Sequence, residues 1–325
     1  MASKFREAQR TKQINLIEST EIFDNSSGGG YFMGKPRDFV LNEPMSNLYH
    51  PIRVDVINYM NSNNISWWGG DKPSGHTLSS QIACLNHLFA IRNDRKAVLK
   101  LLNSVRDEFV DLLTLPCDNN ESYIGFEVVS GEDYLNEKQS TRGSNCTSID
   151  AMIYAIHRSG QRWIIPIEWK YTEHYPNFDK SNGDRSGTEN RGLNGKGIER
   201  LNRYSLLINN SRQIKTLPNY KGSIYYQEPF YQLMRQTLWA EQVIAHKSSD
   251  LEPLKADDYL HLHVIPTENR DLLDKKYRVS DKGMEDSWRE CLKDQSKYQI
   301  IDPRMLLSSL DEPYADLKSY LNTRY

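Results

Sequence analysis

The chain has 325 residues, of which 38% are hydrophobic and 26% are charged, and its net charge at pH 7 is −2. These values are typical of a globular protein and exclude a disordered chain. No apolar run approaches the ~18 residues that a membrane span needs, and the first residues lack the apolar segment of a secretory signal. We therefore expect a cytoplasmic protein with no membrane partner. The four cysteines form no CxxC pair, which argues against a zinc knuckle or a disulfide framework.

The first third of the chain favours helices. They are expected over residues 5–18, 52–59, 76–89 and 96–113, with a loop-rich arm after the first of them. The second of these helices is ambiguous, because its β-branched residues also suit a strand. Thr77 or Ser79 would cap the third helix. A buried apolar stripe supports the fourth helix, and Pro116 would end it.

The middle of the chain favours strands. They are predicted over residues 123–129, 148–154, 162–170 and 259–266, with one long helix over residues 230–243. Pro166 is disfavoured in a central strand, so we expect it at a β-bulge. The chain beyond about residue 270 looks helical and polar. This order predicts an α/β fold with a mixed β-sheet flanked by helices.

Two of these apolar runs carry charged residues where a core strand would carry none. Glu168 and Lys170 share one face of their strand, and Asp150 joins them if the two runs pair. Two carboxylates ~4 Å apart repel by roughly 4 kcal/mol at an effective dielectric of about 20, so this cluster calls for a cation. Mg²⁺ with a lysine beside it suits phosphodiester hydrolysis. The alternative is a non-nuclease α/β protein in which Asp150 and Lys170 form a structural pair.

The sequence around these charges resembles the PD-(D/E)XK nuclease superfamily. Asp150 is followed after a hairpin-like interval by Glu168-Trp169-Lys170, and the wider order is similar to a bacterial group of restriction-endonuclease-like proteins. That order includes Ser79-Ser80-Gln81, Phe126-Glu127, Ile149-Asp150-Ala151 and Tyr231-Gln232-Leu233-Met234-Arg235-Gln236. The resemblance implies a restriction-endonuclease-like core over residues 76–270. Residues 1–75 would be an extension packed on the core, and residues 271–325 a helical C-terminal extension.

The resemblance also implies roles for individual residues. Asp150 and Glu168 would bind the metal, Lys170 would be the catalytic lysine, and the main-chain carbonyl of Trp169 would be a further ligand. The cofactor would be Mg²⁺ or Mn²⁺, and the substrate would be DNA. A homodimer would suit cleavage of both strands, although no interface can be read from the sequence.

The first helix of the core departs from the pattern of the superfamily. Many members carry an acid there, whereas this chain has Gln81. Glu127, on the adjacent strand, could supply the missing carboxylate as a metal ligand. We therefore expect a Mg²⁺-dependent DNA endonuclease. A catalytically silent nucleic-acid-binding protein with the same fold is the alternative, and Gln81 is its best support.

Basic and amide side chains suggest where nucleic acid would bind. The segment between Lys180 and Lys215 has a surplus of positive charge, which indicates either phosphate contacts or a solvated loop. On the helix over residues 230–243, Gln232 or Gln236 would reach metal-bound water or a phosphate and Arg235 would contact DNA, unless all three are surface polar residues. The remaining candidate DNA contacts are Arg191, Lys196, Arg200 and Arg203.

Two further pairs allow more than one interpretation. Trp67 and Trp68 could stack on bases, but tight packing at a turn is the alternative. His261 and His263 alternate along a strand and share a face. No third ligand lies at metal-binding spacing, so we interpret both histidines as structural.

Overall fold

The computed structural model describes residues 3–68, 70–116, 122–138, 142, 146–183 and 195–325. The helices in this part of the chain are α1 (Lys4–Ser19), α2 (Arg53–Ser62), α3 (Ser80–Leu88), α4 (Arg95–Val105), α5 (Lys196–Asn210), α6 (Phe230–Ala245), α7 (Arg270–Leu273), α8 (Met284–Cys291), α9 (Pro303–Ser308) and α10 (Ala315–Arg324). The strands are β1 (Gly30–Phe32), β2 (Lys35–Arg37), β3 (Phe109–Leu113), β4 (Ile124–Val128), β5 (Ile149–His157), β6 (Arg162–Trp169), β7 (Asp258–Tyr259), β8 (His261–Val264) and β9 (Tyr298–Ile301). None of the described helices is long and apolar enough to cross a membrane.

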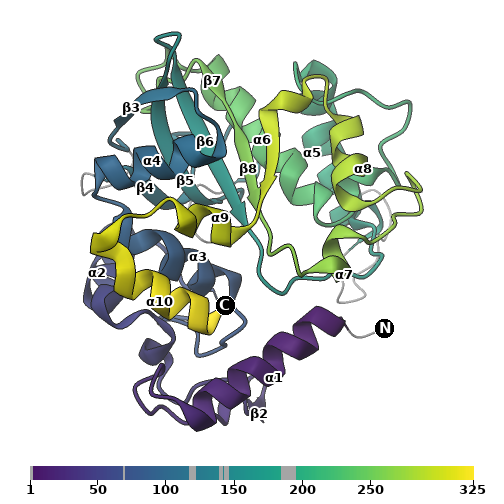
Figure 1. Cartoon of the computed structure of the whole chain (residues 1–325). Coiled ribbons are helices and arrows are strands. Elements are labelled where there is room, and N and C mark those ends of the chain that lie inside the picture. The colour runs from purple at the N-terminus through teal and green to yellow at the C-terminus, as the bar shows by residue number, and fades with distance from the viewer. Residues whose placement is uncertain (1–2, 69, 117–121, 139–141, 143–145, 184–194) are drawn as a thin grey trace.

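The central sheet has seven strands and is mixed. β3 and β4 both pair antiparallel with β5, which in turn pairs antiparallel with β6. On the other side of β6, β7 and β8 run parallel to it, and β9 runs parallel to β8. Helices cover both sides of this sheet (Figure 1). The prediction of an α/β fold with a mixed sheet flanked by helices is therefore confirmed.

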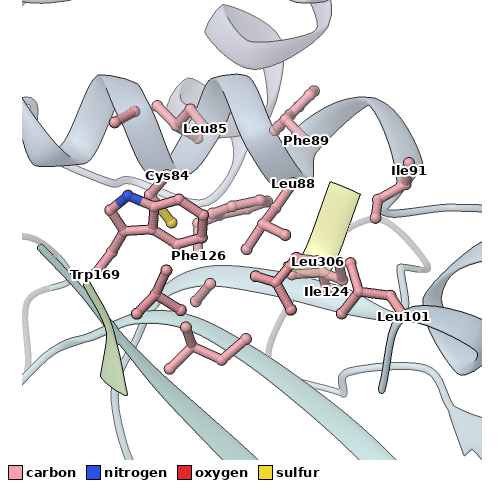
Figure 2. Packing of buried hydrophobic residues seen from close by; sticks show 14 of the residues in the cluster. Cys84, Leu85, Leu88, Phe89, Ile91, Leu101, Ile124, Phe126, Trp169 and Leu306 are labelled. Carbon is pink, nitrogen blue, oxygen red and sulfur yellow. The ribbon is translucent and has the colours of Figure 1, made fainter. Parts of the chain in front are cut away.

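Successive residues of β5 and β6 face two different cores. Ile153 and Ile165 join the core that includes residues of α2, α3, α4, α9 and α10. Figure 2 shows part of this core, with the Trp169 indole packed beside α3. Met152 and Ile164 join the second core, which includes residues of α5, α6 and α8. Because side chains alternate along a strand, Tyr154 follows Met152 into the second core.

Pro166 lies in a regular part of the sheet, so the predicted β-bulge is wrong. It pairs with Met152 in an antiparallel register that continues without a shift along β5 and β6. On the other side of β6, the Leu260 N–H donates to the Ile164 carbonyl at 3.1 Å. Pro166 therefore lies where the parallel ladder is interrupted between β7 and β8. Its lack of an N–H removes no hydrogen bond between β5 and β6.

The helix predicted over residues 96–113 is wrong in its second half. α4 ends at Val105, and Arg106 is already extended, with φ −153° and ψ 106°. Phe109 and Leu112 are buried in strand β3, which pairs with β5. Their spacing of three residues fits a helical stripe, and in the strand the register shifts between Phe109 and Asp111, so the local pattern favoured the helix. Pairing with β5 decides the outcome.

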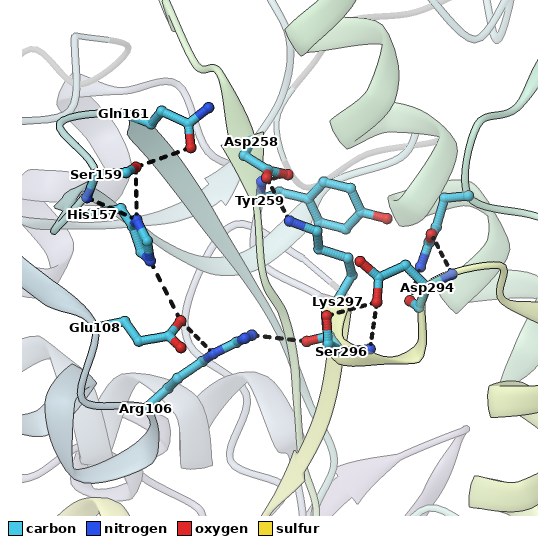
Figure 3. A network of polar contacts seen from close by, with 11 residues as sticks. Arg106, Glu108, His157, Ser159, Gln161, Asp258, Tyr259, Asp294, Ser296 and Lys297 are labelled. Atoms are coloured by element: carbon cyan, nitrogen blue, oxygen red, sulfur yellow. Dashed lines mark hydrogen bonds and ion pairs between the residues drawn. The ribbon is translucent and has the colours of Figure 1, made fainter.

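The region beyond residue 270 is not wholly helical as predicted, because β9 adds a strand to the sheet. A polar network joins the loop before β9 to the end of the sheet where β5 finishes and β6 begins (Figure 3). The start of β5 lies at the other end of the sheet. Arg106 pairs with Glu108 at 2.7 Å and donates to the Ser296 carbonyl at 2.9 Å. Lys297 pairs with Asp258 at 2.5 Å. These contacts leave the end of the sheet that carries the candidate site free of this network.

The N-terminal and C-terminal regions are held together. Ser3 caps α1, and its hydroxyl donates to Asp271 at 2.8 Å, while the Phe5 N–H donates to the same carboxylate at 2.7 Å. Further along α1, the Gln13 amide donates to the Arg324 carbonyl at 2.8 Å. Helix α1 is thereby fixed on the molecule through contacts with residues far away in the sequence.

Candidate active site

Three carboxylates lie in one row across neighbouring strands. In the register of β4 with β5, Glu127 and Asp150 lie between the pairs Phe126–Ala151 and Val128–Ile149, and Asp150 and Glu168 each lie one residue beyond the last pair of β5 with β6, Ala151–Ile167. Glu168 pairs in turn with His263 of β8. Directly opposed residues in a sheet have neighbouring side chains. The pairing of the two charged runs, which the sequence suggested, therefore gathers these acids at one end of the sheet.

Glu127 occupies this row in an unusual backbone conformation. Its φ is 50°, in the left-handed region that non-glycine residues seldom adopt. Phe126 and Val128 consequently belong to different cores, although residues two apart share a face in a regular strand. The Gln81 amide donates to Glu127 Oε1 and the Ser148 hydroxyl donates to Oε2, both at 2.8 Å. Both carboxylate oxygens are thus held by neighbouring side chains.

Asp150 stands at the centre of the row. The Trp169 N–H donates to its Oδ2 at 2.7 Å, while Oδ1 accepts no hydrogen bond within the described part of the chain. Burial and then the charge of Glu168 raise the pKa of Asp150 well above its usual value, against the opposing effect of Lys170. The N–H and C=O of one strand residue point to the same side, so the Trp169 carbonyl also faces β5. A cation beside Asp150 would relieve this repulsion.

Lys170 and Glu168 form a buried ion pair. Glu168 is 1% exposed and Lys170 is 4% exposed, and the Lys170 ammonium donates to Glu168 Oε1. It also donates to Gln232 Oε1 at 2.9 Å. Burial disfavours the charged lysine, but Glu168 and the other acidic groups around it together outweigh that effect, and the pKa of Lys170 lies well above its usual value. Lys170 is therefore a charged side chain whose direct ion-pair partner is Glu168. The alternative from the sequence was a structural pair of Lys170 with Asp150.

A supporting layer of amides and imidazoles holds Glu168. The Gln236 amide donates to Glu168 Oε2 and accepts from His261 Nε2 at 2.8 Å. Burial lowers the pKa of His261 to about 3, so its ring is neutral. His263 contacts the Tyr298 hydroxyl at 2.8 Å through Nδ1. The sequence suggested Gln236, like Gln232, as a contact to metal-bound water or a phosphate, and the structure instead places its amide between Glu168 and His261.

Arg235, which was expected to contact DNA, is committed to a carboxylate. Its Nε and one terminal nitrogen donate to Glu137 Oε1 at 3.0 and 2.8 Å. Glu137 also accepts from the Tyr204 hydroxyl at 2.6 Å and from the Thr147 hydroxyl at 2.8 Å. Burial favours the neutral acid, but Arg235 and these hydrogen bonds outweigh it and lower the pKa of Glu137. This arrangement indicates a structural ion pair beside the site.

The candidates of the basic segment lie on or beside α5. The Arg200 guanidinium donates to the Lys180 carbonyl at 2.9 Å, which ties the preceding loop to the helix. Arg203 pairs with Glu199 at 2.7 Å, one turn earlier on the same helix. Lys196 is exposed in the first turn of α5. Arg191 lies outside the described residues.

A cavity of about 720 Å³ opens in front of the acidic row. This volume is within the range of ~300–1,000 Å³ that is usual for ligand sites. Its lining combines residues of the acidic row and its neighbours with residues of the N-terminal arm, among them Glu127, Asp150, Lys170, Gln232, Arg6, Phe32, Met33, Trp68 and His76. The charged end of the sheet is therefore accessible to a ligand.

The donor atoms at this end of the sheet fit a hard cation such as Mg²⁺. Asp150 offers an oxygen without a hydrogen bond, Glu168 a second carboxylate, and Trp169 a main-chain carbonyl that faces the same strand. Within the described ranges, no group of three or more His, Cys, Asp and Glu side chains is arranged to hold a metal by itself. A bound cation would therefore complete its shell with main-chain oxygen and water, as Mg²⁺ commonly does.

The chain belongs to the family described as "Restriction Endonuclease associating with ARP", whose model matches residues 6–325. The match includes the sheet, the helices on both of its sides and the N-terminal arm. No curated protein matches the chain significantly, and no solved structure does so either. The family connects this chain with restriction endonucleases, and a nuclease or defence-related role agrees with the acidic row.

Proposed function

We propose that this family member is a Mg²⁺- or Mn²⁺-dependent endonuclease of the PD-(D/E)XK type, which hydrolyses phosphodiester bonds in DNA. The observation that carries the proposal is the half-buried Asp150 next to the buried ion pair of Glu168 and Lys170, at an open cavity that Asp150 and Lys170 line. A purely structural pair of Asp150 and Lys170 would not require Asp150 to line a cavity. It would also not explain why one oxygen of Asp150 accepts no hydrogen bond in the described part of the chain.

The proposed metal ligands are Asp150, Glu168 and the main-chain carbonyl of Trp169. When bound, the metal would polarise a phosphoryl oxygen and lower the pKa of a coordinated water. Glu127 borders this ligand set, and like Glu168 it accepts one hydrogen bond at each carboxylate oxygen. Each of these oxygens keeps a second lone pair, so we retain Glu127 as a further proposed ligand.

The other side chains of the site bind, orient and hold charge. Lys170 would place its ammonium beside the scissile phosphate and stabilise the negative charge that develops there. Gln232 accepts a hydrogen bond from that ammonium. Gln236 fixes the second oxygen of Glu168. Gln232, which the sequence suggested as a contact to water or phosphate, is thus proposed to orient the catalytic lysine.

Cleavage of supercoiled plasmid DNA tests the proposal. We expect nicked and linear products with Mg²⁺ or Mn²⁺, and none when the metal is chelated. Lys170→Ala should slow cleavage by roughly 10²-fold or more, the usual cost of removing one preorganised charge from such a site. The matched control is Lys247→Ala, because Lys247 forms a partly exposed pair with Asp257 at 2.6 Å and lies outside the site. Cleavage at the wild-type rate by Lys170→Ala would refute the role assigned to Lys170.

A second candidate function is DNA binding without cleavage, and the amide at position 81 favours it. Gln81 occupies the place where many relatives of the superfamily carry an acid, and its side chain is bound to Glu127 and to the Trp68 N–H at 3.2 Å. The same assay separates the two functions. Tight DNA binding without cleavage in Mg²⁺ or Mn²⁺ would support the silent binder, whereas metal-dependent cleavage excludes it.

A further inference from the structure

One wall of the cavity is built by the N-terminal arm rather than by the sheet. β1 and β2 form a hairpin whose two-residue turn, Met33-Gly34, has positive φ values of 51° and 73°. These values are typical of a type I′ turn, which strongly prefers Asn, Asp or Gly at its first position. Met33 is nevertheless there, is 82% exposed and lines the cavity. The hairpin thus displays a large apolar side chain next to the acidic row.

Trp68 stands on the same wall. Its exposed fraction is 56%, whereas its neighbour Trp67 is 6% exposed and belongs to the core. The Phe32 ring lies 6.0 Å from the Trp68 ring and 4.4 Å from the His76 ring, measured between centroids. The indole of Trp68 is therefore supported by an aromatic neighbour and still open to solvent. Of the two tryptophans, the first packs in the core and the second is free to stack on a ligand.

A single side chain connects Trp68 to the acidic row. Gln81 Oε1 accepts the Trp68 main-chain N–H at 3.2 Å, and Gln81 Nε2 donates to Glu127 at 2.8 Å. Trp68, Gln81 and Asp150 all line the same cavity. A group that stacks on Trp68 would therefore be separated from the carboxylates of the acidic row by little more than the Gln81 side chain.

Two polar side chains on this wall have no partner. The Arg6 guanidinium makes no ion pair or hydrogen bond with any part of the chain that the structure describes, and its Nε is buried. His76 is 5% exposed, and both of its ring nitrogens lack a hydrogen bond. Lys170 and Arg235, which line the same cavity, are each paired with a carboxylate. Because buried polar groups normally have partners, an anionic ligand with acceptor atoms is expected beside Arg6.

We propose that this wall is a subsite for one nucleotide of the substrate whose base has left the duplex stack. Trp68 would stack on the base, Arg6 would contact a phosphate, and Met33 would act as an apolar wedge at the vacated position. Stacking on an aromatic ring suits any base, and apolar side chains commonly enter between base steps. Extrusion costs least for an unpaired base. The inference rests on the proposed nuclease function and adds its substrate class, DNA with an unpaired nucleotide near the cut.

The experiment compares two labelled DNA duplexes that differ only in one central unpaired 2-aminopurine. Binding is measured by fluorescence anisotropy without divalent metal, so that cleavage does not contribute. The wild type should prefer the duplex with the unpaired base by roughly 5- to 100-fold, the range of base–aromatic stacking, and should quench its fluorescence. Trp68→Ala should lose both effects and Trp68→Phe should keep most of them. Leu206→Ala, which removes a 67% exposed side chain of α5, is the matched control.

Arg6 has its own pair of variants. Arg6→Ala should weaken binding of both duplexes and lower the salt dependence of binding, because one phosphate contact is lost. Arg10→Ala, on the same helix but paired with Glu7 at 2.6 Å, should change neither property. Equal affinity of Trp68→Ala and wild type for the unpaired duplex, without a change in quenching, would overturn the subsite. That result would contradict the subsite but not the nuclease function, which plasmid cleavage tests separately. If Lys170→Ala cleaved like the wild type, the proposed function would fail, and the preference for the unpaired base could still be measured.

Discussion

Replacing Arg235 by methionine should destabilise the fold rather than remove a DNA contact. The side chains of Arg235 and Glu137 are 18% and 3% exposed, so the variant leaves an unpaired carboxylate in a nearly dry site. Removing one partner of a buried pair costs about 3–5 kcal/mol of unfolding free energy. Glu137 keeps its hydrogen bonds from Tyr204 and Thr147. We therefore expect the lower end of that range, about 3 kcal/mol.

The pH dependence of this loss follows from the direction of the pKa shift. The folded pKa of Glu137 lies below its usual value, because Arg235 and the hydrogen bonds overcome the effect of burial. The pair therefore contributes its full stability above the unfolded pKa of about 4.3, and the contribution is lost as the pH falls through the folded pKa. The difference in stability between wild type and Arg235→Met should shrink below about pH 4.

Urea unfolding at pH 7 and at lower pH measures these differences. Arg203→Met is the matched control, because Arg203 pairs with the 49% exposed Glu199 one helical turn away. Such exposed pairs contribute only about 0.3–0.5 kcal/mol. Our interpretation is wrong if the free energy of unfolding of Arg235→Met differs from that of the wild type by no more than this amount while the salt dependence of DNA binding falls. Arg235 would then be a phosphate contact.

Two other predictions concern the metal ligands. Mg²⁺ at 100 times its Kd should stabilise the wild type by about 2.7 kcal/mol through linkage, and Asp150→Asn should lose this stabilisation in a thermal-shift assay while its metal-free form stays folded. An equal Mg²⁺ effect in both proteins would exclude Asp150 as a ligand. Gln236→Leu leaves Glu168 without its amide donor, so we expect metal affinity from calorimetric titration to fall by roughly 10- to 100-fold, as is usual for outer-shell ligands. Unchanged affinity would show that Gln236 does not position Glu168.

The centre of the candidate site could be predicted because its signals are local. The alternation that places Glu168 and Lys170 on one face needs only three consecutive residues of a strand. Asp150 joins them because the turn after His157 is short, so that β5 and β6 pair as a hairpin. Gln232 was found in the same way, since its helix has a clear apolar period over residues 230–243.

The features that the sequence did not reveal depend on distant contacts. Arg235 finds Glu137 98 positions earlier in the chain, and nothing near either residue indicates the pair. The left-handed conformation of Glu127 is also invisible in a pattern that reads as a plain strand. Strand β3 was taken for the end of a helix because Phe109 and Leu112 have helical spacing, and a register shift between Phe109 and Asp111 interrupts the regular strand period. In each case tertiary packing overrides a local pattern that allows two structures.

The hydrogen bonds of the acidic row explain how the fold tolerates three neighbouring carboxylates. Both oxygens of Glu127 and both oxygens of Glu168 accept hydrogen bonds from side chains. Asp150 has a single hydrogen bond in the described part of the chain, and it comes from the main-chain N–H of Trp169. Because an ionised carboxylate in a buried row needs compensation on every side, the open Asp150 oxygen is where the protein lacks a positive or donating partner. That gap faces the cavity, so the same deficiency that destabilises Asp150 in the free protein would favour a cation there.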